Sequence, residues 1–352
     1  MARSRNTADT QTASGGPVSP NIAGKNAVIN GGMDIWQRGT TNSMAASTTR
    51  SAGFGADRFQ METGANQATT ISRQSVSDTT NLPSIQYCTR IQRNSGQTGT
   101  GTQYFTQSLE TANSIPLVGK TVTLSFYARA GANYSPTSSI LKPTIWSNTT
   151  TDSNVWAGGW NTVTSPSVTL TTTWQRFSVT GTITATQTQI AIGFEWSPTG
   201  TAGANDYYEV TGVQLELGST ATTFSRNAST IQGELAACQR YYIRYANNGF
   251  QATPLVFGGT NSAYAYVPGL NQMRTVPTTA TTYTNAAYNT GIGAGQWAMG
   301  VDGSGYATKT GTISVNLRTA GISFTGATYS LTPPNFFLAG DSTLYMEASA
   351  EL

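Results

Sequence analysis

The sequence predicts an all-β protein built from more than one domain. Between residues 26 and 226, short runs of alternating apolar and polar side chains are separated by Gly, Ser, Thr and Asn, without a helical period. Charged residues make up only 10% of the chain, against about a quarter in an average protein, so uncharged hydroxyls and amides must cover the surface. The 352 residues exceed what one hydrophobic core usually takes. We therefore expect an N-terminal arm, a β-sandwich, a short linker helix and a C-terminal β-sandwich domain.

The composition excludes several kinds of chemistry. The chain has no histidine, which removes Ser–His and Cys–His nucleophiles and the commonest zinc ligand. A net charge of +3, scattered along the chain, predicts no nucleic-acid partner. No run of about twenty apolar residues is present, so no membrane insertion is expected. The opening residues MARSRNTADT also lack the apolar segment of a secretion signal.

The two cysteines, Cys88 and Cys238, lie 150 positions apart. One disulfide bridge and two buried free thiols are both compatible with this spacing. We favour the free thiols, because unpaired cysteine is among the most buried residue types.

Residues 1–25 are expected to form an extended attachment arm. They are rich in Ser, Thr, Gly and Pro, and Val18 and Ile22 are their only sizeable apolar groups after Met1. Such a segment cannot offset the entropy of ordering its own chain. It is either a flexible terminus or an arm that orders when it docks on a partner, and we favour the arm.

Residues 26–39 are predicted to be the entry strand of the sandwich. Val28, Met33 and Trp36 are among the apolar residues of this stretch, and Gly31-Gly32 would let the strand bend in its middle. Further alternating runs predict the strands that follow, at residues 56–61, 85–91, 104–109, 121–129, 173–179, 189–196 and 208–217. In the run at 121–129, the alternation places Val122, Leu124, Phe126 and Ala128 inside.

Residues 227–246 are predicted to be a linker built around a short helix from about Thr230 to Tyr241. The sequence Ser-Thr-Ile-Gln at 229–232 is typical of a helix start, and apolar residues then recur at helical spacing. The remaining residues, 247–352, are expected to form a second β domain with few charges and few large aliphatic side chains. So thin a core predicts that copies of this domain assemble.

Five motifs that occur in order resemble those of bacteriophage tail-fibre and virion-fibre proteins with a carbohydrate-binding-module-like jelly roll. They are the entry stretch 26–39, Ala-Asp-Arg-Phe at 56–59, the Gly-Lys to Ala-Arg run at 119–129, Trp-Gln-Arg-Phe-Ser at 174–178 and Val-Gln-Leu-Glu-Leu-Gly at 213–218 with Thr-Phe at 223–224. Phe59 departs from the tryptophan that is common in the family. Further matches are Cys-Gln-Arg-Tyr-Tyr at 238–242, Met-Arg at 273–274 and the terminal Ala-Glu-Leu.

The resemblance implies a homotrimeric fibre whose function is adsorption to the host cell surface, by binding a surface glycan. Residues 1–25 would attach it to a virion tail or baseplate protein, or to a neck or capsid protein. Residues 26–226 would form the jelly roll, 227–246 the linker helix, and 247–352 the domain for trimerisation and host contact. The alternatives are a capsid- or neck-attached structural fibre or decoration protein with little glycan binding, and a surface-glycan depolymerase. The absence of a secretion signal fits a virion protein that is released by lysis.

The loop from residue 145 to residue 160 is the leading candidate for glycan contact. Trp146, Trp156 and Trp160 lie there among Ser, Asn, Thr and Gly, and Tyr134 is expected to join them. Aromatic rings stack on the C–H faces of sugars, while hydroxyl and amide side chains bind sugar hydroxyls. The competing interpretation is that at least two of these tryptophans belong to the core.

A second candidate surface lies in the C-terminal domain, far from the arm. It comprises Tyr283, Tyr288, Trp297 and Tyr306, which lie in or beside loops rich in Gly, Asn and Thr.

The acidic residues predict structural roles rather than catalysis. A glycoside hydrolase needs two carboxylates on either side of the bond that it cleaves, and Glu195 with Asp206 or Glu209 is the pair that the sequence offers. We expect these carboxylates instead to face solvent or to pair with arginines, the candidates being Arg58, Arg129 and Arg176.

No cofactor is expected. Asp34, Asp57 and Glu209 have the oxygen ligands that a structural calcium ion would take, but no contiguous calcium loop is present. Salt bridges are the favoured interpretation of these carboxylates.

Overall fold

The computed structural model describes residues 24–246 apart from 48, 50 and 65, and, beyond them, residues 273–275, residues 345–352 and the strands named below. The chain divides into two compact units, each considered by itself. The first extends to Cys238 and includes the last residue, Leu352; the second runs from Gln239 to Glu351. The predicted attachment arm lies outside the described residues except for Gly24 and Lys25.

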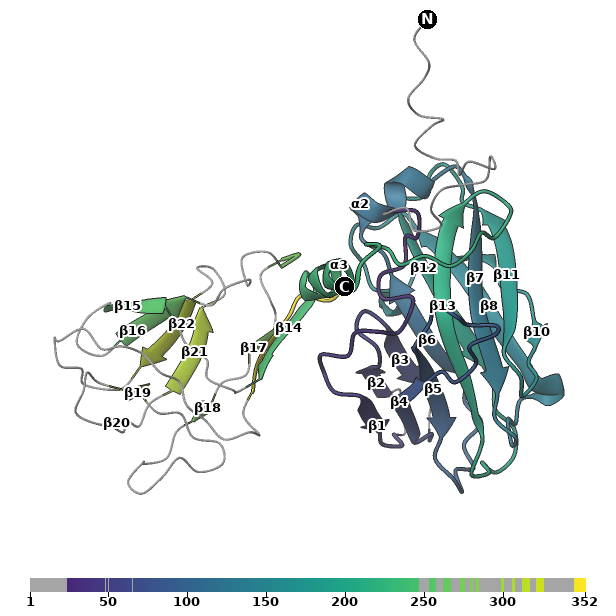
Figure 1. The fold of residues 1–352 in the computed structure, drawn as a ribbon, viewed down its shortest axis with the longest axis horizontal. Helices are drawn as coiled ribbons and strands as arrows, with labels where there is room; N and C mark the ends of the chain where they lie inside the picture. Colours follow the sequence, from purple (N-terminus) through teal and green to yellow (C-terminus); the bar gives the residue numbers. More distant parts are fainter. Residues whose placement is uncertain are drawn as a thin grey trace, which may run out of the picture. The chain divides into compact units, whose positions relative to one another are not determined.

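The first unit is a sandwich of two antiparallel sheets, as predicted for an all-β jelly roll (Figure 1). The first sheet has the order β1 (Thr41–Met44), β4 (Thr69–Ser75), β5 (Tyr87–Arg93), β13 (Tyr207–Leu217), β7 (Thr121–Ala130) and β11 (Gln175–Thr182). The second sheet has the order β10 (Val168–Thr169), β8 (Ile140–Asn148), β12 (Gln189–Trp196), β6 (Gln103–Ser108), β3 (Gln60–Thr63) and β2 (Ser51–Phe54), and β9 (Asn161–Thr164) also pairs with β8.

Side chains from both sheets meet in one core. In β7, Val122, Leu124, Phe126 and Ala128 are all buried in it, as the alternation predicted. The ring of Phe126 packs edge to face against the ring of Phe194 in the opposite sheet, with centroids 4.8 Å apart. Strict alternation along the strands therefore fixes which side chains are left on the outer faces.

The predicted entry strand is wrong, because residues 26–39 form turns and irregular backbone rather than a strand. Val28, Met33 and Trp36 are buried in the core, so the apolar pattern was interpreted correctly. Only two backbone hydrogen bonds join the segment to β13, from the Ala27 N–H to the Leu215 carbonyl and from the Val213 N–H to the Gly31 carbonyl. Asparagine side chains make many of its other hydrogen bonds. The Asn26 amide donates to the carbonyls of Val213 and Ser225 and accepts from the Val28 and Leu215 N–H groups.

The side chain of Asn30, four residues later, also forms hydrogen bonds with backbone groups. It adopts a left-handed backbone with φ of 59°, a conformation that asparagine tolerates better than most residues. Its side chain accepts from the N–H groups of Asp34 and Ile35 and donates to the carbonyls of Ile35 and Asp57. The entry segment is thus a set of turns held by asparagine side chains, with two backbone hydrogen bonds to β13.

Both cysteines are buried free thiols, as favoured from their spacing. Cys88 packs with Trp174 and Phe224 in a smaller cluster outside the main core. Burial raises the pKa of the Cys88 thiol well above its ordinary value, and the Glu209 carboxylate raises it further. The thiol is therefore held protonated and unreactive.

The predicted helix is α3 (Ile231–Gln239). Its start is capped by Thr230, whose hydroxyl accepts a hydrogen bond from the Gly233 N–H. The buried Glu234 carboxylate accepts from the N–H groups of Asn30 and Ala228, which ties α3 to the entry segment. The rest of the predicted linker is not helical: β14 (Tyr242–Ala246) pairs with β23 (Tyr345–Ser349). Tyr242 and Tyr245, whose spacing resembled that of a helix, therefore belong to a strand of the second unit.

The described part of the second unit is composed of antiparallel strands, as expected. One sheet has the order β14, β23 and β17 (Thr279–Ala280). A second has the order β15 (Thr253–Phe257), β16 (Ser262–Tyr266), β22 (Gly321–Thr325), β21 (Thr312–Asn316) and β18 (Tyr283–Thr284), and β19 (Met299–Gly300) pairs with β20 (Tyr306–Ala307).

Hydrogen bonds of Arg274 join three of the sequence motifs, at 238–242, 273–274 and the terminal Ala-Glu-Leu. Arg274 donates from its side chain to the carbonyls of Ala350 and Glu351, and from its backbone N–H to the Arg240 carbonyl. Within the described residues, no helix is long and apolar enough to cross a membrane.

Candidate functional site

The outer face of the second sheet carries the side chains of β8 and β12 that do not point into the core. In β8 and β12, Ile145, Ile190, Ile192 and Phe194 point into the core. Because neighbouring residues in a strand face opposite sides, Trp146 lies on the outer face.

The three tryptophans predicted at residues 145–160 come together on this face. Trp146 is buried beneath a cluster that includes Val155, and Trp156 and Trp160 pack against it half-buried. The loop after β8 makes this possible, because it folds back over the sheet through the short helical turn η3 (Val155–Ala157). Trp146, Trp156 and Trp160 are called the tryptophan patch below.

The loop that carries the patch is fixed by amide side chains. Asn154 accepts a hydrogen bond from the Trp156 backbone N–H, and its carbonyl accepts one from the Trp160 indole at 3.1 Å. The Asn154 amide also donates to the Gln60 side chain at 2.6 Å. Trp156 meets the ring of Tyr104 edge to face, with centroids 4.9 Å apart. The indole rings are therefore held in place before any ligand binds.

Tyr134 does not join the patch. Its ring lies in the main core, stacked on Trp196 with centroids 5.4 Å apart, and its hydroxyl donates to the Ile140 carbonyl. Burial raises the pKa of this hydroxyl well above its ordinary value. The polar sequence around Tyr134 suggested an exposed loop, but the ring fills the end of the sandwich.

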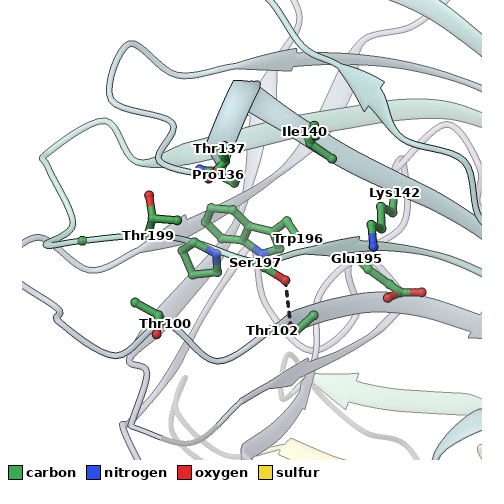
Figure 2. A pocket seen from close by; sticks show the side chains of 12 residues that line it. Thr100, Thr102, Pro136, Thr137, Ile140, Lys142, Glu195, Trp196, Ser197 and Thr199 are labelled. Atoms are coloured by element: carbon green, nitrogen blue, oxygen red, sulfur yellow. Dashed lines mark hydrogen bonds between the residues drawn. The ribbon is translucent and has the colours of Figure 1, made fainter.

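A pocket of about 510 Å³ lies where β8 begins and β12 ends (Figure 2). Lys142 and Glu195 stand at one side of it, Thr100 and Thr199 at the other, and Trp196 between them. This volume is within the usual range for small-molecule sites, which is roughly 300–1,000 Å³. The sequence drew attention to Glu195, but not to Lys142, because only the strand register places the two residues side by side.

A buried arginine organises the walls of this pocket. The Arg93 guanidinium is fully buried and paired with Asp206 at 2.8 Å. It also donates to the carbonyls of Gln97, Gly99 and Gly200, on the two loops that flank the pocket. The Ser135 N–H donates to the other Asp206 oxygen, which ties in a third loop. Several separate chain segments are thus held by one ion pair.

The carboxylates offered for hydrolysis are not arranged as a pair beside a cleft. Glu209 is buried in the first sheet, between Arg90 and Arg129, at 2.6 Å from each. Asp206 is buried against Arg93, and Glu195 lies on the second sheet. The predicted pairing with Arg129 is confirmed. Arg58 donates to the Ser108 carbonyl, and Arg176 to the Thr222 carbonyl.

The three acids considered for calcium are engaged at different places. Asp34 pairs with Arg226 at 2.8 Å, Asp57 accepts from the backbone and side chain of Gln37, and Glu209 has its two arginines. In the part of the chain that the structure describes, no three acidic or cysteine side chains gather around a common point.

Only fragments of the second candidate surface are described. The backbones of Tyr283 and Tyr306 lie in β18 and β20. Tyr288 and Trp297 lie outside the described residues.

Several solved structures are similar to this chain. A carbohydrate-binding module of the type CBM4 has 19% identity and a TM-score of 0.31, over 54% of this chain and 98% of that chain. The enzymatically active domain of tailspike protein 4 from bacteriophage CBA120 has 12% identity and a TM-score of 0.32, over 55% of this chain and 21% of that chain. A xylan-binding domain from Paenibacillus barcinonensis has 13% identity and a TM-score of 0.28, over 58% of this chain and all of that chain.

No model of a known protein family matches this chain, and no curated protein matches its sequence. The sandwich assignment rests on the strand pairing of the chain itself.

Proposed function

We propose that this chain is a non-enzymatic bacteriophage fibre protein that adsorbs the virion to its host by binding a surface glycan. The tryptophan patch makes the contact. In this proposal the protein resides in the virion, as a tail fibre, and docks on a tail or baseplate protein through residues 1–25.

The observation that carries glycan binding is the patch itself. Three indoles from one loop and one strand gather on the outside of a sheet, and two of them keep part of their surface exposed. A contiguous apolar patch that stays partly exposed on a surface is typical of a binding site. Sugar rings offer apolar C–H faces for stacking and hydroxyls for the surrounding Asn, Ser and Thr side chains.

The assignment to a phage fibre is supported by the order of the sequence motifs and by the low charge of the chain. The motif residues also have structural roles: Asn26 and Asn30 hold the turns of the entry segment, and Arg129 pairs with the buried Glu209. Such residues preserve a scaffold. They leave the loops free to vary, which suits a protein family whose members recognise different surfaces.

Binding of the full chain to host cells, competed by purified surface polysaccharide, tests this function. Trp160→Ala and Trp156→Ala are each expected to weaken binding by about tenfold or more, because each removes a stacking face. Tyr87→Ala is the matched control, since it removes a half-buried aromatic ring from the first sheet. It is expected to bind as the wild type does.

The other functions give different outcomes. Failure of the wild-type chain to bind host cells at any concentration would favour a structural fibre or decoration protein of the capsid or neck. Release of reducing sugar that is lost in Glu195→Gln would identify a depolymerase instead.

A further inference from the structure

The pocket at the end of β8 and β12 contains two opposite charges that do not pair with each other. Lys142 and Glu195 are directly opposite in the register of β8 and β12, a position in which Cβ atoms lie about 5 Å apart. Within the described residues, Lys142 forms no ion pair with Glu195 or with any other carboxylate. One Glu195 oxygen accepts a hydrogen bond from the Thr144 hydroxyl at 2.9 Å. A strong donor and a strong acceptor thus stand side by side at the pocket.

The rest of the pocket presents hydroxyl groups and short apolar walls. Thr102 and Ser197 join their hydroxyls across two loops at 2.8 Å (Figure 2), while Pro136 and Pro198 supply apolar surface. The Arg93 hydrogen bonds hold the loops that carry these groups. The site is therefore built before a ligand enters, which lowers the entropic cost of binding.

The charges of the lining residues cancel, because Lys142 and Glu195 are its only charged members. A pocket without net charge has no long-range attraction for an anion or a cation. The pocket suits a ligand in which one atom donates a hydrogen bond to the Glu195 carboxylate and a neighbouring atom accepts one from the Lys142 ammonium group. Adjacent hydroxyls of a sugar ring do both, since each hydroxyl is a donor and an acceptor.

We infer that this pocket is a second sugar subsite, which binds a neutral sugar unit by holding two adjacent hydroxyls between Lys142 and Glu195. The inference rests on the proposed function, because it assigns a further part of the same glycan to this chain. Lys142 and Trp146 lie on the same face of β8, four positions apart, which is about 13 Å along a strand. One glycan chain running along β8 can therefore occupy the pocket and the tryptophan patch together.

The test measures binding of the full chain to neutral oligosaccharides of increasing length, from galactan, mannan and xylan, and to polygalacturonate. Lys142→Met keeps the length of the side chain and removes its charge, and Glu195→Gln removes the opposite charge. Each is expected to weaken binding of neutral oligosaccharides by about tenfold, the effect of losing one hydrogen bond to a charged group. Lys120→Met is the control, because Lys120 is an exposed lysine that does not line the pocket.

The outcomes separate this subsite from the proposed function. Loss of binding in Lys142→Met and Trp160→Ala alike, with longer oligosaccharides bound more tightly, supports both. If Lys142→Met binds as the wild type does while Trp160→Ala loses binding, the subsite alone is overturned. If Lys142→Met loses binding while Trp160→Ala keeps it, the result supports the pocket and contradicts the tryptophan patch. Stronger binding of polygalacturonate than of neutral oligosaccharides also overturns the subsite. Absence of binding to all of these glycans, by a chain that still binds host cells, overturns the subsite alone.

Discussion

Single buried side chains hold together parts of the sandwich that are far apart in the sequence. Glu234 joins the start of α3 to Asn30, although the two residues are 204 positions apart. Burial raises the pKa of the Glu234 carboxyl, and its two backbone hydrogen bonds offset this only in part. The folded protein therefore holds this proton more tightly than the unfolded chain does.

The ionisation of Glu234 predicts a pH dependence of stability. As the pH rises from the ordinary glutamate pKa of about 4.3 through the raised value in the folded protein, the free energy of unfolding should fall. Glu234→Gln keeps one acceptor and cannot ionise, so it should remove this part of the dependence. Urea unfolding of both proteins across this pH range measures the effect. Parallel curves for the two proteins would show that Glu234 does not titrate as described.

At the residue scale, the sequence predicted burial better than it predicted hydrogen bonding. The tryptophans of 145–160 were predicted as one patch, and they do gather on the outer face of the second sheet. Glycan binding by this patch stays a prediction. Tyr134 was wrongly placed in the patch, because its position depends on how the sheet ends. Lys142 was not singled out, because only strand register places it beside Glu195. Neither the end of the sheet nor the strand register can be predicted from the local pattern of residues.

At the element scale, regular alternation was a reliable guide and irregular segments were not. The strand containing Val122, Leu124, Phe126 and Ala128 matched its prediction because one face of it must be buried. The entry segment also carries buried apolar residues, but the side chains of Asn26 and Asn30 make many of its hydrogen bonds. Val213 and Ser225, which accept from Asn26, lie nearly two hundred positions away in the sequence, so no local signal marks them.

The close packing of the entry segment leads to a sharp prediction for Gly31. A Cβ atom at this position would lie 2.0 Å from the Val213 carbonyl oxygen, which is part of the backbone and cannot turn away. Gly31→Ala should therefore lower the free energy of unfolding by about 3 kcal/mol or more, as measured by urea denaturation.

The control for this substitution is Gly96→Ala. Gly96 has a φ of +83° and open space around it, so alanine there should cost only about 1–2 kcal/mol, for the left-handed backbone. Equal destabilisation by the two substitutions would contradict the packing described for Gly31.

At the scale of the whole molecule, the proposed fibre requires more than one copy of the chain. In α3, the buried Glu234 and Cys238 face inward, while Ile231 and Leu235 are 43% and 36% exposed. Residues four apart share one face of a helix, so these two form a small apolar stripe. We propose that this stripe meets its copies in a homotrimer.

Sedimentation of the purified chain tests this assembly. The wild type should sediment as a trimer, and Ile231→Lys with Leu235→Lys should shift it toward the monomer, because charges would enter the interface. Ile115→Lys places the same charge at another exposed isoleucine, 50% exposed, and should leave the trimer intact. A wild type that stays monomeric at all concentrations would exclude the homotrimer.

Glycan contact at the tryptophan patch is the central claim, and a structure of the chain bound to a fragment of its host's surface polysaccharide tests it most directly. We predict a sugar ring stacked on Trp156 or Trp160, with further units extending along β8 toward Lys142. A sugar bound only elsewhere, with both indoles uncovered, would contradict the account.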